Sequence, residues 1–289
     1  MELFKKIGEL QPKHSEAEGN KRLTELIVSE KPFMAARFGS VEVKAMLYSL
    51  LPRPLGKAFR KWATEYMRMN AGFFPTDDKS LRRFAELMLE SMAELDVLAV
   101  WRLEELYFRK ELRGVYKIPL NVISGPSLTH EPGVWTKALR GRKVLVVSPF
   151  ADSIARQYSK HRGVLFGKYS DEVMPPLQSL ETVKAVQTIA GNSGGWSSWF
   201  EALEWMEKEI DGKDFQTALI GCGAYGFPLA AHVKRTGRQA LHVGGALSIY
   251  FGIKGKRWDN SGLYNEYWVS PSESERPENL EKVEGGCYW

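Results

Sequence analysis

Lys143-Val-Leu-Val-Val-Ser148 is the clearest signal of a buried strand in this sequence of 289 residues. Its apolar side chains run continuously instead of alternating with polar ones, which is typical of a strand covered on both faces. Pro149 and Phe150 follow, and a helical pattern occupies residues 151–160. A buried strand that leads directly into a helix is the unit from which parallel sheets with crossover helices are built.

The same order of strand and helix recurs along the chain. Apolar runs predict strands at 33–38, 96–101, 118–124, 143–148, 163–166, 183–190, 217–220 and 239–243. Helical patterns fall at 15–29, 40–51, 57–69, 79–95, 103–112, 134–139, 151–160, 199–210, 227–236 and 246–252. No hairpin turn of the Asn-Gly type joins two strands. The sequence therefore predicts an α/β fold of the Rossmann-like kind, with a mainly parallel sheet and helices on both faces.

We expect one domain that spans residues 1–289. The length suits a single large α/β domain, and the hydrophobic share of 44% and charged share of 26% are those of a globular chain. The sequence shows no internal repeat and no low-complexity linker. From about residue 259 the periodicity is lost and Ser, Glu, Pro and Asn become frequent, so this end is expected to wrap over the surface.

Composition excludes several classes of protein. The net charge is +5, but Lys and Arg are interspersed with acids, so no nucleic-acid partner is expected. Two distant cysteines, Cys222 and Cys287, exclude a disulfide framework and a Cys-rich zinc site. The five histidines form no metalloprotease or triad pattern. Neither a secretory signal nor an apolar run of 18 residues occurs, so we expect a cytoplasmic protein without a transmembrane segment.

Gly221-Cys-Gly-Ala-Tyr-Gly226 is a GxGxxG motif between a predicted strand and a predicted helix. Gly221 and Gly223 would allow a tight turn that brings phosphate close to the helix N-terminus. A dinucleotide fold also requires an acid at the end of the next strand, to hold the ribose. Here that strand ends in Val243-Gly-Gly245. The motif alone therefore leaves nucleotide binding, dinucleotide binding and a purely structural turn as alternatives.

Arg37-Phe-Gly-Ser-Val-Glu42 joins the end of the first predicted strand to the start of a helix. Open α/β sheets bind ligands at this edge, outside the carboxyl ends of the strands. Arg37 offers a planar fork for phosphate, and Glu42 offers an oxygen ligand for Mg²⁺ or Mn²⁺. A surface arginine and a helix-capping glutamate are the alternative interpretation.

Lys254-Gly-Lys-Arg-Trp258 places three cations beside a glycine near the end of the last predicted strand. Lys254, Lys256 and Arg257 could neutralise a departing diphosphate, although a solvated basic turn has the same composition. Weaker candidates stand at other strand ends or in the C-terminal wrap, and a carboxylate among them could act as the base toward an acceptor hydroxyl. These are Asp152, Ser124-Gly-Pro126, Asn265 and Glu266.

Four segments together resemble the bacterial glycosyltransferases of the GT-D fold, over most of the chain. They are the strand–RFGSVE–helix entry that ends at Glu42, LIGCGAYGFPLAAHVK at 219–234, GGALSIYFGIKGKRW at 244–258 and VEGGCYW at 283–289. The resemblance implies transfer of a sugar from a nucleotide-sugar donor, UDP-linked, to a glycan, glycolipid or glycoprotein acceptor. It also implies a role in bacterial surface polysaccharide synthesis.

In that family an Arg-aromatic-Gly-Asp-x-Glu run holds a divalent metal on the donor diphosphate. Arg37, Phe38, Gly39 and Glu42 match the run, but Ser40 stands in place of the aspartate. The resemblance thus implies Mn²⁺ or Mg²⁺ held by Glu42 alone with water, or a metal-free site in which the basic segment carries more of the phosphate charge.

The sequence leads to one principal hypothesis and two alternatives. The first is a glycosyltransferase of the hexosyltransferase kind, with the diphosphate held by Arg37, Lys256, Arg257 and a metal on Glu42, and with Glu266 or Asp152 as base. The second is an NAD(P)-dependent reductase or epimerase of nucleotide sugars, which rests on the GxGxxG motif. The third is a non-catalytic nucleotide-binding partner in glycan assembly, suggested by Ser40.

Overall fold

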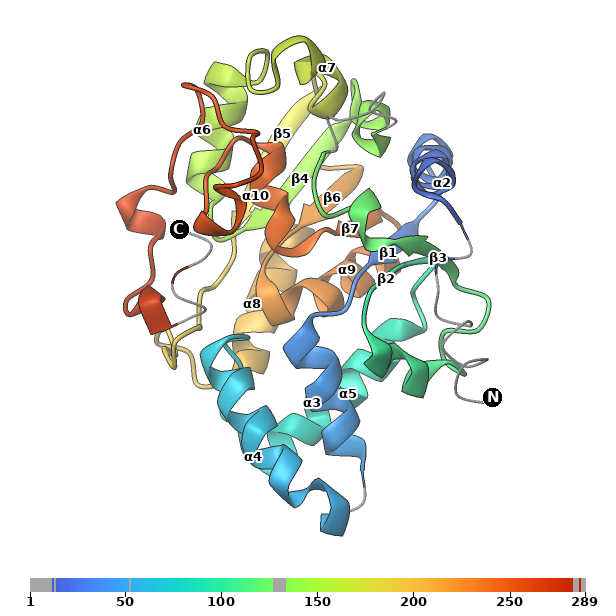
Figure 1. Cartoon of the computed structure of the whole chain (residues 1–289), viewed down its shortest axis with the longest axis vertical. Coiled ribbons are helices and arrows are strands. Elements are labelled where there is room, and N and C mark those ends of the chain that lie inside the picture. Colours follow the sequence, from blue (N-terminus) through green and yellow to red (C-terminus); the bar gives the residue numbers. More distant parts are fainter. Residues whose placement is uncertain (1–11, 13, 52, 127–133, 283–285, 287–289) are drawn as a thin grey trace.

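A single sheet of seven parallel strands organises the chain (Figure 1). The structure is a computed structural model that describes residues 12, 14–51, 53–126, 134–282 and 286, with only the backbone of residues 53–58. The strand order is β3-β2-β1-β7-β6-β4-β5. The predicted parallel sheet with helices on both faces is therefore confirmed. In the described part of the chain, no helix is long and apolar enough to cross a membrane.

The strands are short, and their backbones pair in parallel register. Their bounds are β1 Phe33–Ala36, β2 Val97–Val100, β3 Tyr116–Pro119, β4 Lys143–Ser148, β5 Ser179–Lys184, β6 Thr217–Ile220 and β7 Gln239–His242. β4, the KVLVVS stretch, lies between β5 and β6 and is buried along almost its whole length. Its continuous apolar run follows from this, because both faces of the strand are covered.

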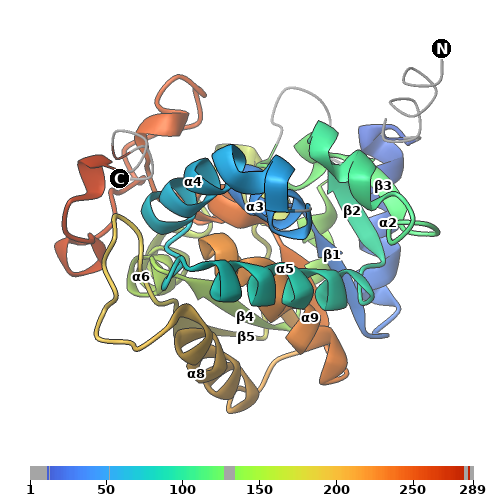
Figure 2. The same cartoon turned by 90° about the horizontal axis from the view of Figure 1, so that it is seen from below.

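Alternate residues of each strand feed two separate cores. In β1, Met34 and Ala36 enter one cluster of buried side chains, and Phe33 and Ala35 enter the other. Figure 2 shows the helices of the first cluster beside the sheet. The first cluster takes side chains from α3 Ser40–Leu50, α4 Arg53–Met69, α5 Asp78–Met92, α8 Trp199–Asp211 and α9 Gly226–Arg235. The second takes them from α2 Glu16–Val28, α6 Ala151–His161, α7 Ser170–Val173 and α10 Leu247–Tyr250.

Helix boundaries follow local capping. Ser198 accepts a hydrogen bond from the backbone N–H of Glu201 at 3.2 Å and so begins α8, as its S-x-x-E pattern predicts. The Glu201 carboxylate, however, accepts from the N–H of Ser197 rather than from that of Ser198. α4 begins at Arg53, four residues before the predicted start at 57. Pro54 lies in its first turn, where the missing N–H has no intrahelical partner to lose.

The strand predicted at 163–166 is wrong, because these residues continue the turn that ends α6. The N–H of Val164 donates to the carbonyl of His161. The carbonyl of Leu165 accepts from Trp268 Nε1 at 3.0 Å and from Asn265 Nδ2 at 3.2 Å. The C-terminal wrap thus takes the place of a neighbouring strand, and the apolar side chains fill the core beneath it.

Three other predictions are shifted along the chain. β5 covers Ser179–Lys184 rather than 183–190. Because β5 is an edge strand with half-exposed side chains, its apolar signal is weak, and the apolar residues after it belong to a loop. β3 covers Tyr116–Pro119 rather than 118–124, and a turn of 3₁₀ helix, Leu120–Val122, follows it. The helix predicted at 103–112 is the 3₁₀ helix η1, Leu103–Phe108.

The connections between strands reverse direction at the centre of the sheet. From β1 the chain moves outward through β2 to β3, whereas β6 and β7 return from β4 to lie beside β1. A crevice forms outside the carboxyl ends of the strands at such a reversal, and open α/β sheets bind their ligands there.

Candidate functional site

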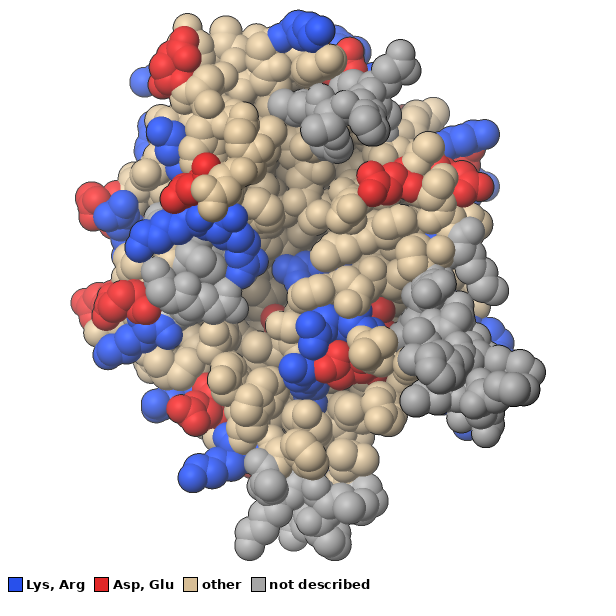
Figure 3. All heavy atoms as spheres, in the orientation of Figure 1, with Lys and Arg blue, Asp and Glu red and all other residues tan. Residues whose placement is uncertain are grey.

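A cleft with about 1150 Å³ of empty space, partly open to solvent, lies at the carboxyl edge of the sheet. The ends of β1, β7, β6 and β4 all contribute to it, through Arg37, Gly244, Gly221 and Ser148. Figure 3 shows the hollow near the middle of one face, with Lys and Arg atoms on both its sides. Its place at the reversal of strand direction is that of a ligand site in open α/β sheets.

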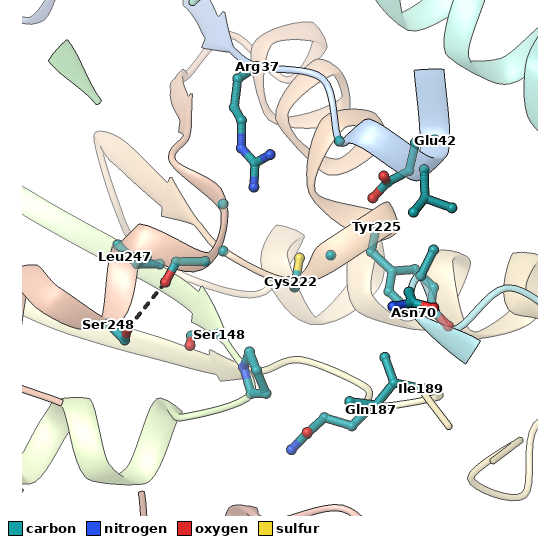
Figure 4. Close-up of a pocket in the computed structure, with 18 of the residues that line it drawn as sticks. Arg37, Glu42, Asn70, Ser148, Gln187, Ile189, Cys222, Tyr225, Leu247 and Ser248 are labelled. Atoms are coloured by element: carbon teal, nitrogen blue, oxygen red, sulfur yellow. Dashed lines mark hydrogen bonds between the residues drawn. The ribbon is translucent and has the colours of Figure 1, made fainter. Parts of the chain in front are cut away.

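Arg37 follows β1 and points into the cleft (Figure 4). One guanidinium nitrogen donates to the carbonyl of Phe38 at 3.2 Å, and the group lies 5.6 Å from the ring centre of Trp101. Among the described residues it makes no ion pair with a carboxylate. Burial and the nearby Arg37 lower the pKa of His242 to about 3, so the imidazole is neutral. Because the Arg37 guanidinium faces the cleft and neutralises no carboxylate among the described residues, it is suited to bind an anionic ligand.

Gly244 lies directly against the Arg37 guanidinium and leaves room for it. Its φ is +72°, and a Cβ placed there would collide with the Arg37 guanidinium. Any side chain at this position is thus both strained in its backbone and in conflict with the arginine. The double glycine at the end of β7 provides the space in which the guanidinium lies.

We expect Gly244→Ala to weaken anion binding almost as much as loss of Arg37 itself, because the methyl group displaces the guanidinium. The left-handed backbone adds a stability loss of about 1 kcal/mol. Isothermal titration with UDP measures the first effect, and thermal unfolding measures the second. In an Arg37→Ala background, Gly244→Ala should have little further effect on binding, and additive losses would contradict the contact.

Glu42 and Ser40 enter the cleft from the first turn of α3. The Glu42 carboxylate folds back over Gly39, so closely that a Cβ at Gly39 would overlap it. This position, the N-terminal turn of a helix, favours a negative charge. Glu42 is the one carboxylate that lines the cleft among the described residues.

The GxGxxG motif forms the back of the cleft, with Gly221 and Gly223 in its lining. A Cβ at Gly221 would lie 2.5 Å from the carbonyl oxygen of Gly244, so this glycine permits close approach of the loops after β6 and β7. Gly223 begins a turn of 3₁₀ helix that leads into α9. N–H groups at such helix starts lack intrahelical partners and suit phosphate. Cys222 is buried beside them, and burial raises the pKa of its thiol.

Trp101, at the end of β2, is a cleft residue that the sequence motifs do not reveal. Its Nε1 donates to the carbonyl of Phe38 at 2.8 Å, which fixes the ring, and 39% of the residue remains exposed. An exposed, fixed indole beside Arg37 is suited to stacking on a base or a sugar. Its position at the carboxyl end of an apolar run is the signal from which it could have been identified.

Glu105 lies buried in η1, close behind Trp101. One carboxylate oxygen accepts from the N–H of Arg102 at 3.2 Å, and the other has no hydrogen-bond partner among the described residues. Burial raises the pKa of this carboxyl from 4.5 to about 8. The protonated, neutral form therefore dominates in the folded protein at neutral pH.

This raised pKa predicts how stability depends on pH. Between about pH 4.5 and about pH 8 the folded protein binds more protons at Glu105 than the unfolded chain does, so the free energy of unfolding falls as pH rises. The slope attributable to this group is at most about 1.4 kcal/mol per pH unit. Glu105→Gln should remove this part of the dependence in urea unfolding curves, and the exposed control Glu111→Gln should keep it. Identical slopes in both variants would contradict the assignment.

The opposite wall is the loop after β5. Val186, Gln187, Thr188 and Ile189 line the cleft, although the sequence places them in a strand. Thr188 Oγ1 donates to the carbonyl of Gly72 at 2.6 Å and lies 2.8 Å from the hydroxyl of Tyr225. Figure 4 shows Gln187 and Ser148 across the pocket from Arg37 and Glu42.

Several predicted site residues lie outside the cleft. Of the basic segment only Arg257 lines it. Lys256 is exposed, and the Lys254 ammonium lies 5.7 Å from the ring centre of Tyr264 in the C-terminal wrap. Gly255 is extended and Lys256 begins a turn of 3₁₀ helix, Lys256–Trp258, so the three cations of this segment do not form one clamp.

Neither predicted catalytic base outside the first motif reaches the cleft lining. Asp152 lies at the surface, where its carboxylate pairs with Lys184 at 3.2 Å. Glu266 is exposed in the C-terminal wrap. Asn265 beside it has a structural role, since its amide holds the carbonyls of Val164 and Leu165. The segment 283–289 that contributed to the resemblance lies outside the described residues, apart from Gly286.

Among the described residues, the cleft offers a divalent metal one carboxylate rather than a full set of protein ligands. No group of three His, Cys, Asp or Glu that could hold a metal occurs in the described part of the chain. Glu42 is the single carboxylate of the lining, with Ser40 where the family pattern has a second. Two residues with guanidinium groups, Arg37 and Arg257, line the same cleft and bring positive charge to it.

Comparison with known proteins relates the chain to solved structures only. No protein-family model and no curated protein matches the sequence. A domain of unknown function 1792, described as having a distinct glycosyltransferase fold, matches with a TM-score of 0.43 and 15% identity, covering 90% of this chain and 96% of that one. A glycosyltransferase with this domain from Streptococcus sanguinis matches with a TM-score of 0.40 and 12% identity, covering 89% and 94%. The first structure is described by its glycosyltransferase fold, and the second is described as a glycosyltransferase.

Proposed function

We propose that the protein is a glycosyltransferase that holds a nucleotide-sugar donor, UDP-linked, in the cleft at the carboxyl edge of its sheet. The observation that carries this proposal is the Arg37 guanidinium, which faces the cleft over Gly244 without a carboxylate partner among the described residues. The sequence resemblance supplies the reaction class, and a glycan or glycolipid acceptor comes with it. A role in bacterial surface polysaccharide synthesis belongs to the same proposal.

Arg37 and Arg257 would bind the diphosphate of the donor. As the bond between the sugar carbon and the phosphate oxygen breaks, its electron pair goes to the diphosphate, and the two cations stabilise the charge that develops. The glycine loops at Gly221–Gly223 and at 244–245 let the phosphates approach the backbone. Trp101 would stack on the base or the sugar and so orient the donor.

Glu42 is the carboxylate within the cleft that can serve as the base. A new bond forms between the acceptor oxygen and the sugar carbon while the hydroxyl proton passes to the Glu42 carboxylate. This assignment replaces Glu266 and Asp152, because a base must reach the proton that it removes and neither residue lines the cleft. A non-catalytic nucleotide-binding role would lack this proton transfer.

We expect donor binding to be independent of divalent metal, because guanidinium groups replace the metal's charge. UDP should raise the thermal unfolding temperature equally with EDTA and with Mn²⁺. Transfer of labelled sugar from UDP-sugar donors should likewise persist in EDTA. Strict dependence of UDP binding on Mn²⁺ would overturn the metal-free site, and stabilisation by NAD(P) rather than UDP would favour the redox alternative.

A further inference from the structure

The hairpin formed by α3 and α4 projects from the body of the molecule at one end of its longest axis (Figure 1). α3 ends at Leu50 and α4 begins at Arg53. Ala63 and Met67 of α4 enter the core, and the partly buried rings of Tyr48 and Trp62 pack against it. Other residues of the hairpin form an apolar surface that lies outside the cleft.

Apolar and aromatic side chains of the hairpin are exposed. Leu50 is 40% exposed, Phe59 50% and Tyr66 41%, and the rings of Tyr48 and Trp62 lie between them. Tyr48 stacks on Phe59 with ring centres 4.8 Å apart, and Trp62 stacks on Tyr66 at 4.4 Å. The rings form a continuous stripe, spaced three and four residues apart on α4.

Positive charge prevails in the sequence of α4 and at the start of α5. The sequence of α4 contains five Lys or Arg and a single Glu. The Lys44 ammonium lies 5.1 Å from the ring centre of Trp62 and 3.7 Å from a carboxylate oxygen of Glu104. Where the hairpin meets the start of α5, a second hollow, with about 700 Å³ of empty space open to solvent, is lined by three cations and one acid. These are Arg60, Lys79, Arg82 and Asp78, of which Arg60 and Asp78 pair at 2.9 Å.

We propose that the α3–α4 hairpin docks the protein on an anionic lipid surface. Trp, Tyr and Phe prefer the boundary between headgroups and acyl chains, and Lys and Arg at the same depth attract lipid phosphates. The exposed rings of the hairpin and the cations of α4 and of the start of α5 match these two layers. A second copy of this chain would bring the same positive charge against itself, so charge complementarity favours the lipid surface.

The docked hairpin would also place the cleft near the membrane, a consequence that rests on the proposed function. Asn70 and Ala71, which directly follow α4, line the cleft. The helical rise puts Asn70 about 16 Å along the axis from Phe59. A lipid-linked acceptor whose headgroup lies at the surface would then meet the open side of the cleft.

Co-sedimentation with vesicles tests the docking without any sugar substrate, so it is independent of the transferase assignment. The full chain should bind to vesicles of phosphatidylcholine mixed with phosphatidylglycerol. It should bind much less to vesicles of phosphatidylcholine alone. Phe59→Ser should lower the bound fraction about tenfold. Combined Lys79→Glu and Arg82→Glu substitutions should lower it about 25-fold or more, at about fivefold for each cation.

Matched controls lie elsewhere on the surface. Tyr107→Ser removes a more exposed aromatic ring from η1, and Lys208→Glu reverses an exposed charge on α8; both should bind vesicles like the unmodified protein. Equal losses in these controls, or no preference for anionic vesicles, would overturn the proposal. So would a concentration-dependent dimer in size-exclusion chromatography that Phe59→Ser abolishes without any vesicle binding.

Discussion

Arg37→Ala is expected to weaken UDP binding by about 30-fold and to lower sugar transfer by about 10²–10³-fold. A hydrogen bond to a charged group contributes about 1.5–3 kcal/mol, and loss of one donor to a developing negative charge slows reactions by this order. The effect is large because Arg37 faces the cleft and makes no ion pair with a carboxylate among the described residues. Isothermal titration and initial rates measure the two losses separately.

Two variants show whether this loss reflects the position of the guanidinium. Arg37→Lys keeps the charge but not the planar fork, so binding should recover only in part. Arg109→Ala removes an exposed arginine outside the cleft and should leave both binding and transfer unchanged. If Arg37→Ala binds UDP like the unmodified protein, the cleft is not the diphosphate site.

Glu42→Gln is expected to lower the rate of transfer by about 10²–10⁴-fold while the affinity for UDP changes little. The amide has nearly the shape of the carboxylate but cannot accept the acceptor's proton, and general-base catalysis contributes about this factor. A split between kcat and the binding constant is therefore the expected result. Thermal unfolding of the variant controls for the position of Glu42 in the first turn of α3.

The two surface carboxylates provide the matched controls. Asp152→Asn and Glu266→Gln alter the acids that sequence reasoning placed in the same role, and both should transfer sugar at the rate of the unmodified protein. A large loss in either variant, with Glu42→Gln fully active, would return the role of base to the C-terminal wrap or to α6.

The strands whose sequences were easiest to interpret are those at the centre of the sheet. β4, β6 and β7 are covered on both faces, so their apolar runs coincide with their bounds, and the predicted and observed limits agree at residues 143–148 and 217–220. The predicted position of the edge strand β5 was too late in the chain, because the strand is half-exposed and its apolar signal is weak. The run at 163–166 was mistaken for a strand because Leu165 and Phe166 are as apolar as strand residues, yet their partners are Trp268 and Asn265, about 100 residues later.

The candidate site divides in a similar way. Arg37, Gly39, Ser40, Glu42, Gly221, Gly223 and Arg257 were all identified from sequence, and the structure gathers them in one cleft. They were identifiable because each lies in a motif at a strand end or beside one. Trp101 and Thr188 belong to no motif, and only the place of Trp101 at the end of an apolar run distinguishes it. Asp152, Lys256 and Glu266 are exposed and Lys254 is partly buried, and spacing along the chain does not specify which of these side chains face the cleft.

The sequence by itself determined the class of fold, because continuous apolar runs followed by helices can bury their surface only in a parallel sheet covered on both faces. It also determined which loops stand at the carboxyl edge of that sheet. Only the tertiary structure decided that β7 lies between β1 and β6, and therefore that Gly244 lies beneath Arg37. The reason is physical: strand order depends on contacts between segments some 200 residues apart. The apolar run KVLVVS indicates that its strand is buried but does not specify which strands lie beside it.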